Sequence, residues 1–376
     1  MPHRPAKPVG VVPLDLTHHD RLGPAVDQAI RNNLSVLEVT GDTLWTASDE
    51  TASIERLVTT DRGASYGDHR SFKLGDYFDL PEPDGEVDIE GVAAEGHWLW
   101  VTGSMSLARK KPKPGETDPK AALERLTQVK TDPNRWLLGR IPCLPAADGA
   151  HALHRSVTLA DGTHLEAACL KLSAKGANPL TKALKGDEHL ARFLEVPAKE
   201  NGFDVEGLAV APGKHGVARV FLGLRGPVLR GWAVVLELEI EMGKHGRLRL
   251  CGIGPDDEPY RKHFLDLDGL GIRDMKVRGD DLLLLAGPTM DLDGPVAVWR
   301  WPEGLLATDQ DVVPRSRLVR VLDVPHGVGF DHAEGMCLRT LPGEDRPRLL
   351  VAYDNPGKDR MHRDGADIDL DLFDLP

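Results

Sequence analysis

The 376-residue sequence predicts an all-β fold, a β-propeller with short helical insertions, in which six blades are favoured over five or seven. Three observations support this fold class. The chain contains 39 glycines and 28 prolines, a content of turn-forming residues that is typical of proteins with many short strands. A short motif of the form x-Glu-Gly-apolar recurs along the chain. Its recurrences are separated by about 60 residues or a multiple of that length, which indicates repeated propeller blades.

The motif is written as "DIEGV" at 88–92, "DVEGL" at 204–208 and "HAEGM" at 332–336. Two looser relatives are "NLSVLEVTGDTLWTAS" from Asn33 and "GIRDMKVRGDDLLLLAG" from Gly271. All five combine an apolar-x-apolar segment, a turn rich in Gly or Asp, and a second apolar run, which together predict a β-hairpin. We call the central residue of each motif its key position; these residues are Ser35, Glu90, Glu206, Arg273 and Glu334.

The spacing of the key positions predicts the number of blades. Successive positions are 55, 116, 67 and 61 residues apart, and the gap of 116 is close to twice the others. It therefore predicts a sixth unit. The candidate is "HLEAACLKL" from His164, because it parallels "HAEGMCLRT" from His332, and it would place Glu166 at the sixth key position.

Other segments predict the outer strands and the closure of the ring. "RWLLGRI", "AVVLELEIE" and "VAVWRW" follow predicted hairpins and read as outer strands. The tail "DIDLDLF" alternates acidic and apolar residues, and we expect it to pair near the N-terminal "VGVVPLDL", because ring closure removes exposed strand edges. Residues 118–130 and 178–194 have helical spacing and helix-start residues, so we expect helical insertions there. The whole chain, 1–376, is expected to form one propeller domain.

Composition excludes several classes of protein. The net charge of −13 argues against non-specific nucleic-acid binding, which needs a basic face. No run of 18 apolar residues exists, so we expect no membrane span, and the N-terminal segment lacks the apolar core of a secretory signal. The four cysteines are scattered in apolar runs and are expected to be free thiols. Together these observations favour a cytoplasmic protein.

The key positions predict a site at the centre of the propeller. The innermost strand of each blade lines the central channel, so equivalent positions of different blades converge there. Residues two apart on a strand share a face, and each key glutamate therefore gains a neighbour. The predicted pairs are Asp88 with Glu90, Asp204 with Glu206, and His332 with Glu334.

Converging carboxylates need compensation. At about 6 Å, two carboxylates repel by roughly 3 kcal/mol at an effective dielectric constant of 20. Arg273 is one internal counterion, and a divalent cation (calcium, magnesium or manganese) is the other solution. The alternative is structural: the glycine turns the chain and the glutamate caps backbone groups. The residues expected to hold a metal are Glu90, Glu206, Glu334, Asp88 and Asp204.

Basic residues near the hairpins predict a ligand-binding function. In "FLGLRGPVLRGWA" (221–233), Arg225 and Arg230 lie among glycines, and arginine forks suit carboxylate or phosphate oxygens. Lys111, in "SMSLARKKPKPG" (104–115), occupies the corresponding place after "DIEG"; the alternative there is a solvated loop. Asp274, next to Arg273, completes the candidate ligand-binding residues.

Four segments carry a family resemblance: "DIEGVAAEGHWLWVTGSMSLARKKP", "KENGFDVEGLAVAP", "FLGLRGPVLRGWA" and "DHAEGM". With them the chain resembles a bacterial family of unknown function with a propeller fold, from about Leu34 to its end. The D-x-E-G repeats are also distantly similar to those of esterase-like phytase propellers, which implies a metal-supported phosphoester site by analogy alone. The closer family supplies no activity to transfer.

Two functions follow from these features. The first is a hydrolase for a phosphate- or carboxylate-bearing small molecule, with a divalent cation and His332, Glu334 and Arg273 as catalytic residues. The second is a non-catalytic platform that binds a protein partner or ligand, with the charged ring stabilising the axis. Binding of a small anionic ligand without turnover uses the same arginines and stays open beside them.

Overall fold

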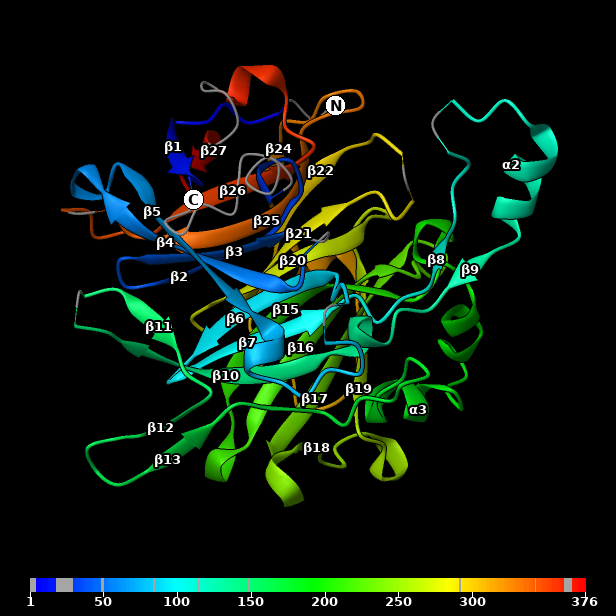
Figure 1. Ribbon diagram of the computed structural model, residues 1–376, viewed down its shortest axis with the longest axis horizontal. Coiled ribbons are helices and arrows are strands. Elements are labelled where there is room, and N and C mark those ends of the chain that lie inside the picture. Colours follow the sequence, from blue (N-terminus) through cyan, green and yellow to red (C-terminus); the bar gives the residue numbers. More distant parts are fainter. Residues whose placement is uncertain are drawn as a thin grey trace.

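Five four-stranded sheets form the blades of a β-propeller in the part of the chain that the structure describes (Figure 1). The structure is a computed structural model. It describes residues 5–17, 30–48, 51–83, 85–113, 115–147, 149–290, 292–341, 343–361 and 367–376.

Each blade contains four strands, the first of which is innermost. Blade 1 consists of β2 (Leu34–Thr40), β3 (Thr43–Ser48), β4 (Ser53–Thr60) and β5 (Ser65–Lys73). Blade 2 consists of β6 (Ile89–Glu95), β7 (Trp98–Gly103), β10 (Leu138–Pro145) and β11 (His151–Leu153). Blade 3 consists of β15 (Asp204–Pro212), β16 (Ala218–Gly226), β17 (Trp232–Met242) and β19 (Arg261–Asp266). Blade 4 consists of β20 (Gly271–Arg278), β21 (Asp281–Gly287), β22 (Val296–Trp301) and β24 (Val319–Val324). Blade 5 consists of β25 (His332–Arg339), β26 (Arg348–Asp354), β27 (Asp367–Phe373) and β1 (Gly10–Asp15).

Further short strands lie outside the four-stranded blades. The further strands are β8 (Ala108–Arg109), β9 (Val129–Lys130), β12 (Ser156–Thr158), β13 (His164–Glu166), β14 (Ala168–Cys169), β18 (Leu248–Leu250) and β23 (Asp311–Val313). Of these, β14, β18 and β23 extend the sheets of blades 2 and 3, whereas β8 with β9 and β12 with β13 form separate two-stranded hairpins.

The ring closes between the two ends of the chain. Strand β27 pairs antiparallel with β1, from Gly10 opposite Leu372 to Asp15 opposite Asp367, so the prediction that the tail pairs near the N-terminal segment is confirmed (Figure 1). Strand β1 also pairs with β5 at Leu14 and Tyr66, so blades 5 and 1 form one eight-stranded sheet. The innermost strands contact one another in the closed order β2, β6, β15, β20, β25 and back to β2.

The blade count differs from the expectation. In the described residues the expected sixth unit is not a blade, because His164–Glu166 is strand β13, which pairs only with β12. The side chain of Glu166 is exposed. The long gap between key positions is filled by additions to blade 2 rather than by a blade. Inserted hairpins and helices lengthen blade 2 by about the length of one repeat, so the spacing of the key positions overestimates the number of blades.

Apolar side chains fill the space between neighbouring blades. Five separate core clusters exist, one for each interface between adjacent blades. Trp45 and Trp299, for example, are fully buried between blades 1 and 2 and between blades 3 and 4. Such inter-blade burial is the main stabilising contribution to the fold. All four cysteines are free, as expected.

Two α-helices lie within the segments expected to be helical. Helix α2 (Pro119–Leu126) begins after Asp118, whose side chain accepts a hydrogen bond from the Lys120 backbone. It lies on an excursion between β8 and β9 that projects from the body of the molecule (Figure 1). Helix α3 (Pro179–Leu184) begins with a capping box of Asn178 and Thr181. Among the described helices, none is long and apolar enough to cross a membrane.

Candidate functional site: a charged cavity at the channel mouth

A β-bulge interrupts the innermost hairpin of every blade at its key position. In blade 1, for example, the strand register shifts between Leu34 and Val36, so Ser35 is the extra residue. The other four hairpins shift in the same way. A bulge re-aims the extra side chain out of the regular alternation. The five bulged residues are the five key positions of the sequence: Ser35, Glu90, Glu206, Arg273 and Glu334.

The glycine after each key glutamate allows neighbouring blades to approach. A Cβ at Gly91 would lie 2.6 Å from the Cβ of Leu208 on β15. A Cβ at Gly335 would lie 2.9 Å from the backbone carbonyl carbon of Val36 on β2. Gly207 is equally tight against Met275 on β20. The Glu-Gly motif thus combines two roles: the glutamate reaches the channel, and the glycine packs the inner strands together.

Two arginines occupy the centre of the carboxylate ring. Arg225, on β16, places its Nη1 2.5 Å from Glu206 Oε1 and 3.8 Å from Asp204 Oδ2. Arg273 binds Glu334 through its Nη1, and its Nε lies 3.6 Å from Glu206 Oε2. The side chains of both arginines are at least nine-tenths buried. Arginines from two blades therefore lie beside the Glu206 carboxylate. The sequence alone left two ways to neutralise the converging carboxylates, an arginine or a divalent cation, and here the chain itself supplies arginines.

A third arginine compensates Asp88. Arg135 lies in the short helix η3 (Pro133–Trp136), and its Nη1 is 2.8 Å from Asp88 Oδ2. The sequence reasoning missed this partner. Its signal was present, because Arg135 is the first residue of the segment "RWLLGRI" that predicted an outer strand.

Burial keeps part of this network protonated at neutral pH. Burial raises the pKa of Asp204 to about 7; Glu206 adds to the rise and Arg225 opposes it. Burial also raises the pKa of Glu334 to about 8, against the opposing effect of Arg273. The pKa of Asp88 is raised by burial despite Arg135. The negative charge of the ring is therefore lower than its carboxyl groups suggest.

A cavity of about 260 Å³ opens over this network. Its cationic lining comes from three elements: Lys199 from the short helix η5 (Ala198–Glu200), Arg225 from β16 and Arg273 from β20. Acidic groups and a histidine line the side formed by blades 4 and 5; these are Asp293, His332, Glu334 and Asp354.

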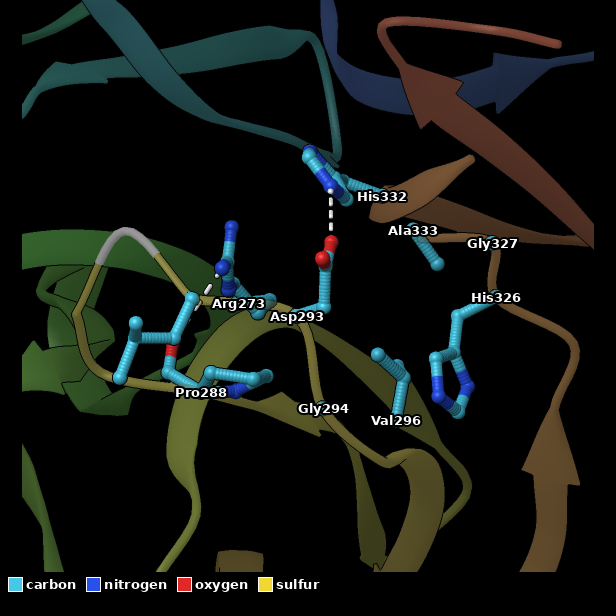
Figure 2. A pocket seen from close by; sticks show the side chains of 10 residues that line it. Arg273, Pro288, Asp293, Gly294, Val296, His326, Gly327, His332 and Ala333 are labelled. Carbon is cyan, nitrogen blue, oxygen red and sulfur yellow. Dashed lines mark hydrogen bonds and ion pairs between the residues drawn. The ribbon is translucent and has the colours of Figure 1, made fainter. Parts of the chain in front are cut away.

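His332 lies between two carboxylates at the wall of the cavity. Its Nε2 is 3.2 Å from Asp293 Oδ1, and its Nδ1 is 3.9 Å from Asp354 Oδ2. Figure 2 shows the imidazole and the Asp293 carboxylate facing one another, with Arg273 beside them. The pKa of Asp293 is lowered, first by the Gly329 N–H that donates to it and then by His332, whereas burial raises the pKa of Asp354.

The structure separates the predicted residues into two groups. Asp88, Asp204, Glu206 and Glu334 belong to one network with Arg225 and Arg273, and His332 lines the same cavity as Glu334. Glu90 is half-buried at the bulge of β6.

Three predicted ligand-binding residues lie elsewhere. Lys111 is exposed on the excursion that carries α2, and Arg230 is exposed in the turn between β16 and β17 with a φ of 52°. Asp274 is 1% exposed and accepts hydrogen bonds from the backbone N–H groups of Met275 and Met336. Asp274 therefore joins blade 4 to blade 5 at the position that Gly holds in three other blades.

Lys199, Asp293 and Asp354 were not identified from the sequence. Asp354 directly follows the apolar run "RLLVAY", so a search for polar residues at the ends of second strands would have found it. Asp293 belongs to "DLDG" (291–294), a segment typical of a turn. Lys199 carries no pattern, because it reaches the cavity from an irregular segment between blades.

Among the described residues, no group of three or more His, Cys, Asp or Glu side chains is placed to hold a metal ion. Glu206 and Glu334 instead have guanidinium groups as counterions. The divalent cation expected from the sequence stays a prediction.

Solved structures with a similar course of the chain share little sequence with it. The allergen Mala s 1 of Malassezia sympodialis is 8% identical with a TM-score of 0.41, over 93% of this chain and 96% of that chain. The α-L-arabinanase of Cellvibrio cellulosa is 11% identical with a TM-score of 0.37, over 92% and 91%. A GH32 β-fructofuranosidase of Bombyx mori is 11% identical with a TM-score of 0.38, over 92% and 62%.

The family membership rests on the sequence. No curated protein matches the chain. A family model, "Protein of unknown function (DUF3616)", matches residues 33–371, a range that includes all five key positions. The chain therefore belongs to the DUF3616 family of proteins of unknown function.

Proposed function

We propose that the protein binds a small molecule bearing a carboxylate or phosphate group in the cavity at the channel mouth. The observation that carries this proposal is the convergence of Lys199, Arg225 and Arg273 on one cavity of about 260 Å³. Guanidinium groups bind such anions through paired, charge-assisted hydrogen bonds.

The carboxyl groups of the site support anion binding rather than oppose it. Glu206 lies between the two guanidinium groups and fixes them in place, which lowers the entropic cost of binding. Glu334 has a pKa raised by burial to about 8, so it is mostly protonated at neutral pH and adds little repulsion. A protonated carboxyl can also donate a hydrogen bond to a ligand oxygen.

Hydrolysis of the bound molecule is the second candidate, favoured by the placement of His332. Its imidazole lies between Asp293 and Asp354, which suits proton transfer at the cavity wall. Glu334, protonated at neutral pH, would serve as the proton donor to a leaving group. Participation of a divalent cation belongs to this candidate. A cytoplasmic location, expected from the sequence, is proposed for either function. The alternative function is a non-catalytic platform in which the charged ring stabilises the axis. It is supported because arginines already pair with Glu206 and Glu334.

The binding proposal is tested by calorimetric titration with inorganic phosphate and with acetate. We expect Arg273→Gln and Lys199→Ala each to weaken binding of the preferred anion, about tenfold or more for the arginine, since a hydrogen bond to a charged group contributes about 1.5–3 kcal/mol. Arg230→Gln is the matched control, because Arg230 belongs to the same sequence block but is exposed. Binding that is undetectable, or equally weakened in Arg230→Gln, contradicts the proposal.

Hydrolysis and metal dependence need a separate assay. Wild type is incubated with a phosphoester and a carboxylester, with EDTA or with added calcium, magnesium or manganese. If wild type hydrolyses either ester and His332→Asn does not, the catalytic candidate is supported. If EDTA abolishes the hydrolysis by wild type, participation of a divalent cation is supported. Anion binding without turnover under every condition rejects both and leaves the binding function intact.

A further inference from the structure

We infer that the ligand of this cavity is amphiphilic: an anionic head group attached to an apolar chain, which lies on an apolar rim beside the cavity. This inference rests on the proposed function and specifies the chemical class of its ligand. The rim is defined by four side chains: Met290, Leu292, Val328 and Phe330.

These side chains are exposed although they are large and apolar. Their exposed fractions are 42% for Met290, 62% for Leu292, 84% for Val328 and 45% for Phe330. The described residues include thirteen large apolar side chains that are exposed, and four of these lie in the two loops at this cavity. Single exposed apolar residues are ordinary, whereas a cluster indicates a binding surface.

The rim is continuous with the cavity. Met290 and Leu292 line the cavity together with Lys199, Arg225 and Arg273. Gly329, between Val328 and Phe330 in the chain, lines it as well. A small crevice next to it shares Arg273 and His332 and extends the apolar wall through Leu292 and Val296. Figure 2 shows Val296 and Ala333 on the side of this crevice away from Arg273. A bound chain can therefore leave the charged cavity past Met290 and Leu292, which line it.

The two rim loops are held together rather than loose. One loop joins β21 to β22 and the other joins β24 to β25. Asp293 of the first loop accepts a hydrogen bond of 2.8 Å from the Gly329 backbone N–H of the second, and it also binds His332. The Asn355 side chain donates to the Gly329 carbonyl at 2.6 Å. These contacts present the apolar side chains in a fixed arrangement, which favours binding.

The cationic side chains of the cavity favour an anionic head group, and the apolar rim favours an apolar chain attached to that head group. A small inorganic anion would leave the rim exposed to water. A chain of several methylene groups would cover it, and each methylene group that leaves water would strengthen binding. A freely diffusing, single-chain amphiphile fits both features, because its head enters the cavity while its chain lies along the rim.

The test uses alkyl phosphates and alkyl carboxylates of two to eight carbons, each below its micellar concentration, titrated by calorimetry. We expect affinity in the preferred series to rise at least about tenfold from the shortest to the longest chain. Val328→Ser/Phe330→Ser should flatten this dependence and leave the two-carbon ligand unaffected, because neither side chain lines the cavity itself. The matched control is Leu123→Ser/Val312→Ser, which removes two similarly exposed side chains outside the rim and should keep the dependence.

The outcomes separate this inference from the proposed function. Binding of the two-carbon anions without any effect of chain length overturns the inference alone. Failure of every anion to bind overturns both. A chain-length effect that the rim variant keeps also overturns the inference, because the chain then lies elsewhere. Rim-dependent binding to vesicles of phosphatidylcholine and phosphatidic acid, without competition by octyl phosphate or octanoate, would assign the rim to a membrane surface and reject the free amphiphile.

Discussion

The two ends of the central channel use the same inner strands in different ways. At the amino-terminal ends of these strands, Arg225 and Arg273 face a cavity of about 260 Å³ with charged groups on several sides. Toward their carboxyl ends, a cavity of about 90 Å³ is lined mainly by apolar side chains, and Lys276 is the one lysine or arginine among its described lining residues. We propose that the first end, the mouth, receives an external ligand, and we call the second end the structural end.

Lys276 illustrates the structural end. Its Nζ donates to the Val92 carbonyl at 3.0 Å and lies 3.2 Å from Asp274 Oδ1 and 3.6 Å from Glu38 Oε2. Burial alone would lower the pKa of Lys276, but the two carboxylates raise it, so the amine stays charged. Its partners come from β2, β6 and its own strand β20. One buried ammonium group thus ties three blades together.

A buried charge beside a cavity is not in itself a sign of function, because Lys276 lines the smaller cavity as Arg225 and Arg273 line the larger one. Both ends contain buried ionisable residues with shifted pKa values, and a shifted pKa therefore does not distinguish them. What differs is the size and lining of the space beside the charge. At the structural end this space is a cavity of about 90 Å³ with a mainly apolar lining, and at the mouth it is a cavity of about 260 Å³ with several charged groups.

The largest effect on the free energy of unfolding is expected at the structural end. Lys276→Met should lower the free energy of unfolding by about 3–5 kcal/mol, because it removes the buried cation from Asp274 and Glu38 and leaves the Val92 carbonyl without its donor. Arg273→Gln, at the mouth, should cost at most about 2 kcal/mol, since Glu334 already binds a proton readily. Urea denaturation of both variants measures the difference. The double variant Asp274→Asn/Lys276→Met should recover part of the loss, and equal costs at the two ends would contradict the comparison.

A second change tests whether the mouth owes its stability to glycine packing. Gly335→Ala should cost about 1–3 kcal/mol, because the added methyl group meets the backbone of Val36, which cannot move aside alone. Gly10→Ala is the control, since its Cβ would have no neighbour within 4 Å. Thermal and urea unfolding give the two values. A neutral Gly335→Ala would show that the bulge, and not close approach, explains the Glu-Gly motif.

A smaller effect concerns pH. A carboxyl whose pKa is raised by folding stabilises the protein below its unfolded-state pKa and loses that contribution as the pH rises through its folded-state pKa. For Glu334 this window runs from its ordinary value of 4.5 to about 8. Glu334→Gln should therefore become more stable relative to wild type by at least about 1 kcal/mol between pH 5 and pH 8. A constant difference across that range would argue that Glu334 is ionised throughout.

The smallest effects are expected at the exposed basic residues. Lys111→Ala and Arg230→Ala should each change the free energy of unfolding by less than about 0.5 kcal/mol, because both side chains are exposed. Neither should change anion affinity at the mouth. A clear loss of affinity in Lys111→Ala would show that the excursion carrying α2 contributes to the site, and would extend the functional end beyond the cavity.

The sequence was sufficient for the propeller fold, the closing strand and the five key positions. Each of these depends on a local pattern that repeats, such as the bulged residue before Gly91, Gly207 and Gly335. The blade count failed because insertions in blade 2 imitate the length of a repeat. Lys199 and Asp293 could not be predicted, since they reach the cavity from loops whose course depends on the packing of whole blades.

At each of the five bulges, the bulged residue and the residue after it are under different structural constraints. In each blade the bulge re-aims one residue out of the regular alternation, while the residue after it is constrained by the adjacent blade. The bulged side chain can therefore change without altering strand register, although Ser35 and Glu206 also contact the adjacent blade. The present combination is Ser35, Glu90, Glu206, Arg273 and Glu334. We propose that single substitutions of Arg273 and Glu334, the two bulged residues that line the cavity, would alter its ligand specificity.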